Sequence, residues 1–292
     1  MMYSLKYRKI QLKPKHKINL NNKLNYIYNE TYALIKRLYL QTKRRPSTLI
    51  SGILQPLLWL ILFGALFQNA PVGLFTENTN YNSFLSPGII IFTAFTGSIN
   101  AGLPLMFDRE FGFFNRLLSS PIKSRNSLIT SHVLFIITIT TIQTLFIIFF
   151  NIVLYEQINY SLTIIFSTLM ITSLITLSIG SMSICLAFIL PGHIELLAFI
   201  LLINLPMLFS STALAPLSFM PYWLQMIASI NPLTYAIEIT RNLLDKTFIE
   251  YKTFIVQNLW MTITIEQGIW ILIIFNIINL IIIKNIIYCK FE

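Results

Sequence analysis

Several long stretches of this sequence contain no acidic residue and no Lys or Arg. Residues 78–106 and 126–155 are two such stretches, and both are largely apolar. About twenty consecutive apolar residues are enough for a helix to cross the hydrocarbon of a bilayer, where each backbone polar group needs a partner within the segment. By this measure we expect six membrane-spanning helices, near residues 47–69, 84–106, 127–155, 161–190, 194–217 and 267–287.

The composition agrees with this assignment. Of the 292 residues, 55% are hydrophobic and 11% are charged, whereas a soluble domain carries about 25% charged residues. We therefore predict an all-α polytopic membrane protein with six transmembrane helices, an N-terminal interfacial helix and a re-entrant outer segment. No acidic residue lies near the middle of an expected span, which argues against an ion-coupled carrier.

Positive charge is concentrated in the first 46 residues. They hold twelve of the 21 Lys and Arg residues and one acid, Glu30. Because this arm leads directly into an apolar span, anionic lipid explains its charge better than a nucleic acid does. Residues 24–39 carry Leu, Tyr and Ile at helical spacing between basic flanks, which predicts a helix in the membrane interface. We divide the chain into this arm and interfacial helix, 1–46, and a transmembrane domain, 47–292.

The distribution of Lys and Arg also predicts the orientation. The segment 107–126 has four basic residues, and the C-terminal tail has Lys284 and Lys290, whereas 70–83 and 156–160 have none. Basic loops stay on the cytoplasmic side or its organellar equivalent. With six spans, the two termini and 107–126 fall together on the cytoplasmic or stromal side.

The segment 205–266 is apolar but interrupted by prolines at 206, 216, 221 and 232. It is too broken for one span and too apolar for a free loop, so we predict that it re-enters the outer leaflet, with Tyr222 and Trp223 at the level of the head groups. The charged residues that follow then mark a return to water on the outer side: Glu238, Arg241, Asp245, Lys246, Glu250 and Lys252.

A short charged break, residues 107–125, separates the second and third spans. Phe107, Phe111, Phe114 and Leu118 share one helical face, and Pro121 ends the pattern. An amphipathic helix here can lie on the bilayer and offer its polar side to a soluble partner. A solvated loop with an apolar anchor is an equally simple interpretation.

Catalytic signatures are absent from the sequence. It has no G-x-x-x-x-G-K-[ST] phosphate loop, no G-x-S-x-G nucleophile, and three histidines without metal-ligand spacing. We expect neither an enzyme nor a metal or cofactor site in this chain. His193 and Glu195 could serve as a proton relay, although an interfacial loop acid is the more common arrangement.

Four sequence clusters follow the basic helix: DREFG at 108–112, RLLSSP at 116–121, MPYWL at 220–224 and NPLTY at 231–235. Together they resemble the permease subunit of ABC-2 type exporters over nearly the whole chain. The resemblance implies a homodimer of permeases, held in membrane lipid, with separate ATPase subunits that bind ATP and Mg. It also implies that 107–120 forms a coupling helix, with Asp108, Arg109, Glu110 and Arg116 as candidate coupling residues. Asn115 stands where the family usually has an acid.

Further expectations follow from this resemblance. The substrate path would be lined by spans two and five, where we single out Thr93, Thr96, Ser98, Ser210 and Ser211, and it would suit an amphipathic, lipid-linked or glycan-like cargo. A bias toward Ile, Asn and Lys, typical of an AT-rich genome, makes the chain similar to permeases encoded in algal plastids, with a bacterial inner membrane as the alternative. A six-span translocase subunit of the twin-arginine type and a membrane scaffold without transport remain the other hypotheses.

Overall fold

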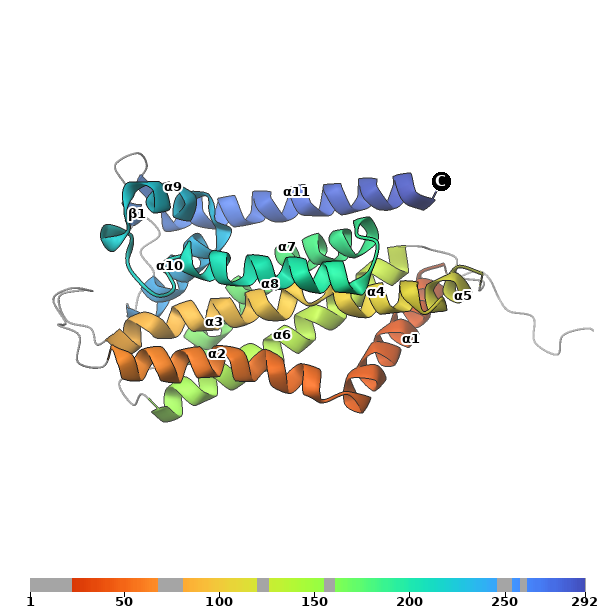
Figure 1. Ribbon diagram of the computed structural model, residues 1–292, viewed down its shortest axis with the longest axis horizontal. Helices are drawn as coiled ribbons and strands as arrows, with labels where there is room; N and C mark the ends of the chain where they lie inside the picture. Colours follow the sequence, from red (N-terminus) through yellow and green to blue (C-terminus); the bar gives the residue numbers. More distant parts are fainter. Residues whose placement is uncertain are drawn as a thin grey trace, which may run out of the picture.

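A computed structural model describes residues 23–67, 81–119, 126–154, 161–245, 254–257 and 262–291. Long apolar helices run side by side along the longest dimension of the molecule (Figure 1). Such segments form helices because an apolar run in lipid must satisfy its own backbone groups. The long helices are α2 (Ser47–Leu66), α3 (Tyr81–Ile99), α6 (Asn126–Leu154), α7 (Leu162–Ile189), α8 (His193–Phe209) and α11 (Ile265–Phe291).

Among the described residues, five helical segments are long and apolar enough to cross a membrane: Leu49–Leu66, Tyr81–Glu110, Ser127–Leu154, Leu162–Ile189 and Ile265–Ile286. This confirms the prediction of an all-α polytopic membrane protein. The expected span at 194–217 corresponds to α8, which has 17 residues and ends at Phe209. The helix stops there because Ser210 and Ser211 turn the chain. A total of six spans therefore stays a prediction.

Helix α3 lies at the centre of the bundle and packs against α2, α6, α7 and α10 (Pro232–Asp245). Sixteen of its 19 residues are buried. Gly88 allows a close approach between backbones, because a Cβ atom there would lie 2.6 Å from the carbonyl oxygen of Ala213. The outer faces of α2, α8 and α11 instead expose Leu and Ile side chains, as expected for helices in contact with lipid.

Helix α1 (Lys23–Arg44) precedes the bundle and packs against α6. From residue 27 on, its buried residues are Leu34 and Leu38, whereas Tyr28 is 69% and Tyr32 is 59% exposed. Tyr28 and Tyr32 of the predicted stripe therefore point outward, whereas Tyr39 contacts the ring of Phe135 on α6. A second apolar face holds the helix to the protein. Pro46 disfavours helical structure in the preceding residue, and it separates α1 from α2.

The interrupted segment forms a 3₁₀ turn (Leu217–Phe219), α9 (Tyr222–Ile230), α10, and the antiparallel strands β1 (Phe254–Gln257) and β2 (Thr262–Thr264). The small β-ladder was not predicted. Tyr222 and Trp223 of α9 are exposed, so they are free to contact head groups, and re-entry itself remains a prediction. Asn231 fixes the corner between α9 and α10, since its Nδ2 donates to Ser210 Oγ at 3.2 Å.

The predicted return to water is wrong for Glu238 and Arg241. The side chain of Asp245 and the residues Lys246, Glu250 and Lys252 lie outside the described part of the chain. Glu238 and Arg241 form an ion pair on α10, and their side chains are 13% and 10% exposed. Arg241 also donates to the carbonyl oxygen of Thr212 at 2.9 Å, and its guanidinium lies 3.8 Å from the ring centroid of Phe84. They are buried because α10 packs against α3, α7 and α11, which its charged sequence did not indicate.

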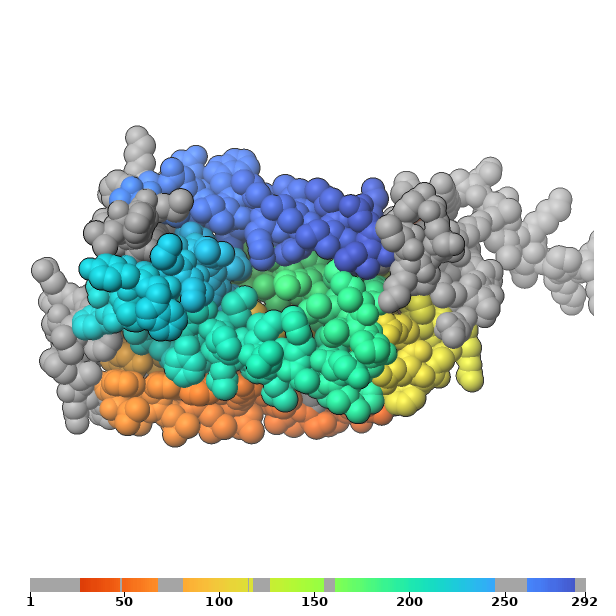
Figure 2. Space-filling view, turned by 45° about the horizontal axis from the view of Figure 1, so that its top comes forward, coloured from red at the N-terminus to blue at the C-terminus, as the bar shows by residue number. Residues whose placement is uncertain are grey.

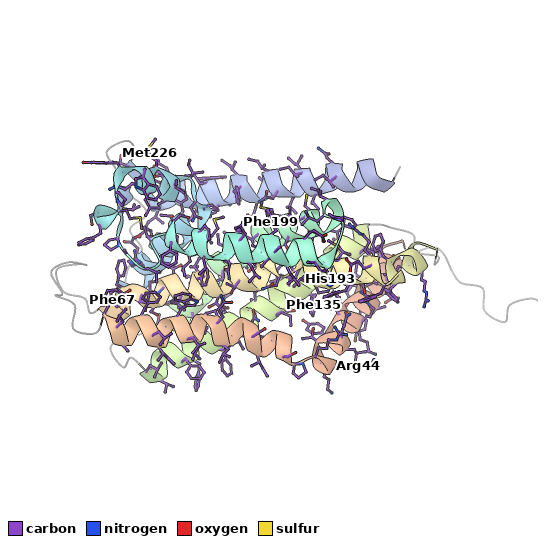
Figure 3. All side chains as sticks on the ribbon, in the orientation of Figure 1. Arg44, Phe67, Phe135, His193, Phe199 and Met226 are labelled. Atoms are coloured by element: carbon purple, nitrogen blue, oxygen red, sulfur yellow. The ribbon has the colours of Figure 1, made fainter. Side chains whose placement is uncertain are left out.

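The two ends of the bundle differ. Helices α1, α4 (Gly102–Glu110) and α5 (Phe113–Ser119) lie at the same end as the C-terminus, and α9, α10 and β1 lie at the opposite end (Figure 1). The space-filling view shows the same separation (Figure 2). In Figure 3, Arg44 and His193 mark the first end and Phe67 and Met226 the second. The first end carries basic residues of α1, α4 and α5, and the side of the membrane on which it lies remains a prediction.

Candidate functional site

The charged break between the second and third spans contains two helices, α4 and α5, so the prediction of one continuous helix over 107–120 is wrong. The break falls at Gly112, whose φ of 71° is in the left-handed region. A Cβ atom at this position would have no neighbour within 4 Å. Glycine is therefore favoured by the backbone conformation, as is common directly after the C-terminus of a helix.

Asp108 faces the interior of the protein. Its residue is 7% exposed, and its carboxylate accepts a hydrogen bond from the guanidinium of Arg37 on α1. The same guanidinium lies 4.4 Å from the ring centroid of Phe113 on α5. Arg37 thus joins α1 to both helices of the break. Because the Asp108 carboxylate pairs with Arg37, any contribution of Asp108 to coupling would act through α1.

Arg109 binds the C-terminal end of α7. Its guanidinium donates to the carbonyl oxygens of Ala187 (2.7 Å), Phe188 (3.1 Å), Leu190 (2.6 Å) and Pro191 (2.9 Å). The last carbonyl groups of a helix lack partners within the helix and carry a partial negative charge. Arg109 supplies both the missing donors and a positive charge.

Glu110 binds the N-terminal end of α8. Its carboxylate accepts hydrogen bonds from the backbone N–H of His193, at 2.6 Å, and from Nδ1 of the same residue. His193 is the first residue of α8, where a negative charge is favoured by the helix dipole. The chain is tight here, because a Cβ atom on Gly192 would lie 2.9 Å from Glu110 Oε1. His193 is thus held at a helix terminus. This favours the interpretation of Glu195 as an interfacial loop acid over a proton relay formed by His193 and Glu195.

Three consecutive residues of α4 therefore reach three different helices: Asp108 contacts α1, Arg109 contacts α7, and Glu110 contacts α8. We call these three residues the α4 joint. Helix α5 continues beyond it, with Phe114 buried against Phe188, at a ring separation of 5.9 Å. Arg116 of α5 is exposed, and Phe111 is 74% exposed. The side chain of Asn115 lies outside the described residues.

The five predicted path residues are all buried. Thr93, Thr96 and Ser98 donate to carbonyl oxygens of α3 itself, at 2.7 to 3.0 Å. Ser210 accepts from Asn231, and Ser211 donates to Leu208 at 2.7 Å. Thr96 also lines a cavity of about 400 Å³ between α1, α2, α3 and α6. A role of these residues in binding substrate remains a prediction.

Sequence reasoning identified the residues of the α4 joint but missed their partners. Arg37 stands next to the buried Leu38 on α1, and a cation beside a buried apolar position could have pointed to an internal ion pair. The carbonyl groups that Arg109 binds carry no sequence signal. The position of His193, directly after Pro191 and Gly192, does predict a helix start that a carboxylate can cap.

Comparison with known proteins identifies the family. Residues 29–244 match the ABC-2 type transporter family. The proposed transport permease ycf38 of Porphyra purpurea is 50% identical over 285 residues, which are 97% of each chain. The same protein of Pyropia yezoensis is 50% identical over 291 residues, 99% of each chain.

A more distant relative comes from Mycobacterium tuberculosis. It is the doxorubicin resistance ABC transporter permease DrrC, which is 24% identical over 234 residues, 80% of this chain and 83% of that protein. The family match covers α1 to α10, including the α4 joint. This chain belongs to the ABC-2 type transporter family and is a membrane permease of an ABC transporter.

Proposed function

We propose that this chain is the membrane half of an ATP-driven exporter and that a separate ABC ATPase subunit docks on the end formed by α1, α4 and α5. The ATPase would bind ATP and Mg, and two permease copies would form the passage. The single observation that carries this proposal is the α4 joint. Three adjacent charged side chains link one short segment to α1, α7 and α8.

The docking surface would include two exposed residues, Phe111 at the break between α4 and α5 and Arg116 of α5. An ATPase that closes on ATP would displace α5 and α4 together. Because packed helices move as rigid elements, the α4 joint would pass this displacement to three helices at once. Asp108, Arg109 and Glu110 would then act in coupling by holding helices, and Arg116 by contacting the partner.

The cargo we propose is amphipathic, with lipid-like or glycan-like character, because the membrane helices offer apolar walls with scattered hydroxyl groups. We further propose a plastid membrane as the location, with the two termini on the stromal side. The support is the similarity to ycf38 over nearly the whole chain together with the basic residues at one end. The family match disfavours the alternative of a twin-arginine type translocase subunit.

A site-specific crosslink tests the proposal. A photoreactive phenylalanine analogue at Phe111 should crosslink, in native membranes, to a protein that contains a phosphate-binding loop and binds ATP. The matched control is the same analogue at Phe219, which is 52% exposed in the 3₁₀ turn at the opposite end. An ATP-binding protein captured at Phe219 and not at Phe111 would contradict the proposed docking surface.

A further inference from the structure

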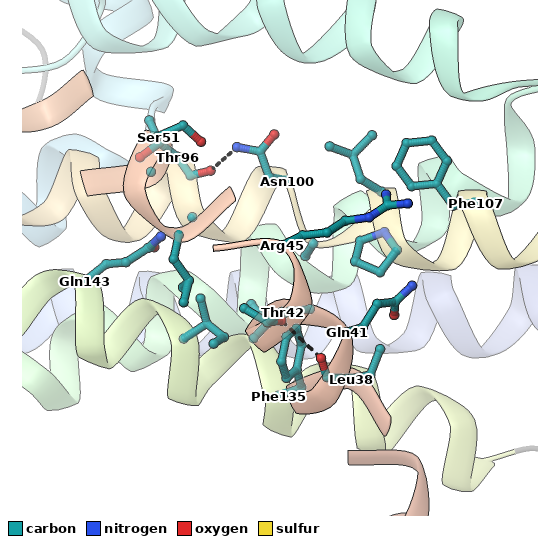
Figure 4. A pocket seen from close by; sticks show the side chains of 18 of the residues that line it. Leu38, Gln41, Thr42, Arg45, Ser51, Thr96, Asn100, Phe107, Phe135 and Gln143 are labelled. Atoms are coloured by element: carbon teal, nitrogen blue, oxygen red, sulfur yellow. Dashed lines mark hydrogen bonds between the residues drawn. The ribbon is translucent and has the colours of Figure 1, made fainter. Parts of the chain in front are cut away.

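A cavity lies where α1 bends into α2. It has a volume of about 400 Å³, is partly open to the surface, and is bounded by α1, α2, the junction of α3 and α4, and α6 (Figure 4). We call it the elbow pocket. Its size falls within the range of about 300–1,000 Å³ that is usual for small-molecule sites. The α4 joint does not line it, so it is separate from the proposed coupling contacts.

The lining combines one cation with several uncharged hydrogen-bonding groups. Arg45, in the bend between the two helices, lines the pocket, and none of the described residues that line it is acidic. Polar groups come from α1, α2, the junction of α3 and α4, and α6: Gln41, Ser51, Gln55, Asn100 and Gln143. Figure 4 shows Arg45, Gln41, Asn100 and Gln143 around the same space. This arrangement favours an anionic ligand that also carries hydroxyl groups.

Gln143 of α6 provides an independent indication of a ligand. Its residue is 3% exposed, and its Oε1 atom has no hydrogen-bond partner in the part of the protein that the structure describes. Burial of an amide oxygen without a donor costs free energy, so such groups are rare unless a ligand or water completes them.

Two glycines make room for this amide. A Cβ atom on Gly52 of α2 would lie 2.3 Å from Nε2 of Gln143, and one on Gly97 of α3 would lie 2.5 Å from its Oε1. No other residue type would leave the amide in place without a shift of the helices. Three helices thus position a polar group that is unsatisfied inside the protein.

The surroundings of the pocket indicate an amphiphile rather than a free ion. Leu54 and Leu58 of α2 are about half exposed, at 51% and 47%, and they belong to an apolar outer face next to the pocket. An alkyl chain could lie along this face while the head group enters the bend. Lys43 and Arg44 precede Arg45, so the mouth of the pocket is in a strongly basic stretch, which attracts anionic lipids.

We propose that the elbow pocket binds the head group of an anionic amphiphile with hydroxyl groups, of the chemistry of phosphatidylglycerol. The phosphate pairs with Arg45, and a hydroxyl donates to Oε1 of Gln143. This inference does not depend on the docking of an ATPase, and it places a lipid binding site between the interfacial helix and the first long helix.

Native mass spectrometry of the full chain in dodecyl maltoside tests this site. The probes are phosphatidylglycerol and phosphatidylcholine, which lacks both the net charge and the hydroxyl groups. Both lipids carry a phosphate, but the choline cation of phosphatidylcholine would lie near Arg45 and offers no hydroxyl group to Gln143. We therefore expect the first phosphatidylglycerol to bind at least about tenfold more tightly than the first phosphatidylcholine. Arg45→Gln and Gln143→Met should each reduce this preference to about twofold or less, since each removes one of the paired groups.

Arg44→Gln is the matched control, because Arg44 is an exposed neighbour that does not line the pocket. It should retain the preference for phosphatidylglycerol.

Gln143→Met should also raise the melting temperature of the lipid-free protein or leave it unchanged, which separates loss of binding from misfolding. If phosphatidylglycerol copurifies with the protein, the bilayer supplies the ligand of this site. If it binds only when it is added, the ligand is an amphiphile that is delivered to the site. Either result supports the site. Equal losses in Arg44→Gln and Arg45→Gln, or binding of glycerol 1-phosphate as tight as that of phosphatidylglycerol, would overturn it.

Discussion

Replacement of Arg109 by Gln removes the four hydrogen bonds from its guanidinium to the last turn of α7 and the two residues that follow it. Hydrogen bonds that involve a charged group contribute roughly 1.5–3 kcal/mol each. The four share one side chain that is only partly buried, so their contributions do not add. We expect a loss of about 2–4 kcal/mol in the free energy of unfolding. Arg116→Gln is the matched control, because it makes the same change on the exposed side of α5, and it should cost about 0.5 kcal/mol.

Two measurements on detergent-solubilised protein check this prediction. The melting temperature of Arg109→Gln should fall by several degrees relative to Arg116→Gln at the same scan rate. Hydrogen exchange should increase at the C-terminal end of α7, near Ala187, and stay unchanged near the N-terminal end of the same helix. Equal melting temperatures for the two variants, together with unchanged exchange near Ala187, would refute the idea that Arg109 holds α7.

Three further substitutions test other contacts by their melting temperatures. Arg37→Leu should destabilise the protein by about 2 kcal/mol, because it leaves Asp108 buried without its partner. The additional substitution Asp108→Asn should recover part of this loss. If nothing is recovered, the two residues do not stabilise the protein as a pair. Arg241→Met should lower the free energy of unfolding by about 3 kcal/mol, because it leaves Glu238 buried without its partner. The double variant Arg241→Met with Glu238→Gln should lose clearly less, because removal of both charges is less harmful than removal of one. If the losses of the two single variants add in the double variant, this expectation is contradicted. Gly112→Ala should cost about 1 kcal/mol through its positive φ alone, with Gly112→Asn closer to wild type; a larger loss for Asn than for Ala would mean that packing, and not the backbone, requires glycine.

Most of the helices could be predicted from the sequence, because long uncharged runs have few other structures available to them in lipid. The sequence did not reveal which face of a helix is buried. On α1, tyrosine and leucine stripes compete, and packing against α6 selects Leu34 and Leu38. Arg241 was expected in water, since its burial depends on carbonyl groups and a ring that come from distant segments.

The candidate site was predictable in its residues but not in its contacts. The run from Asp108 to Glu110 stood out through its charge between apolar spans. Its three partners come from residues 37, 187–191 and 193, and they meet at one end only when the helices pack. The break at Gly112 was missed, because apolar side chains on both sides of it keep helical spacing. Sequence periodicity is thus a weak guide where a single glycine changes the direction of the chain.

The central claim is that the α4 joint transmits the movement of a docked ATPase to separate helices. The most direct test is a distance measurement between spin labels on α1 and α8, in the complex of the full chain with its ATPase. Tyr32→Cys and Leu201→Cys are suitable label sites, since these residues are 59% and 70% exposed, once the native cysteines are replaced by Ser. We predict that ATP changes this distance in the wild-type complex. In the triple variant Asp108→Asn, Arg109→Gln, Glu110→Gln, ATP should no longer change the distance, while the ATPase stays bound. An undiminished change in that variant would contradict the account.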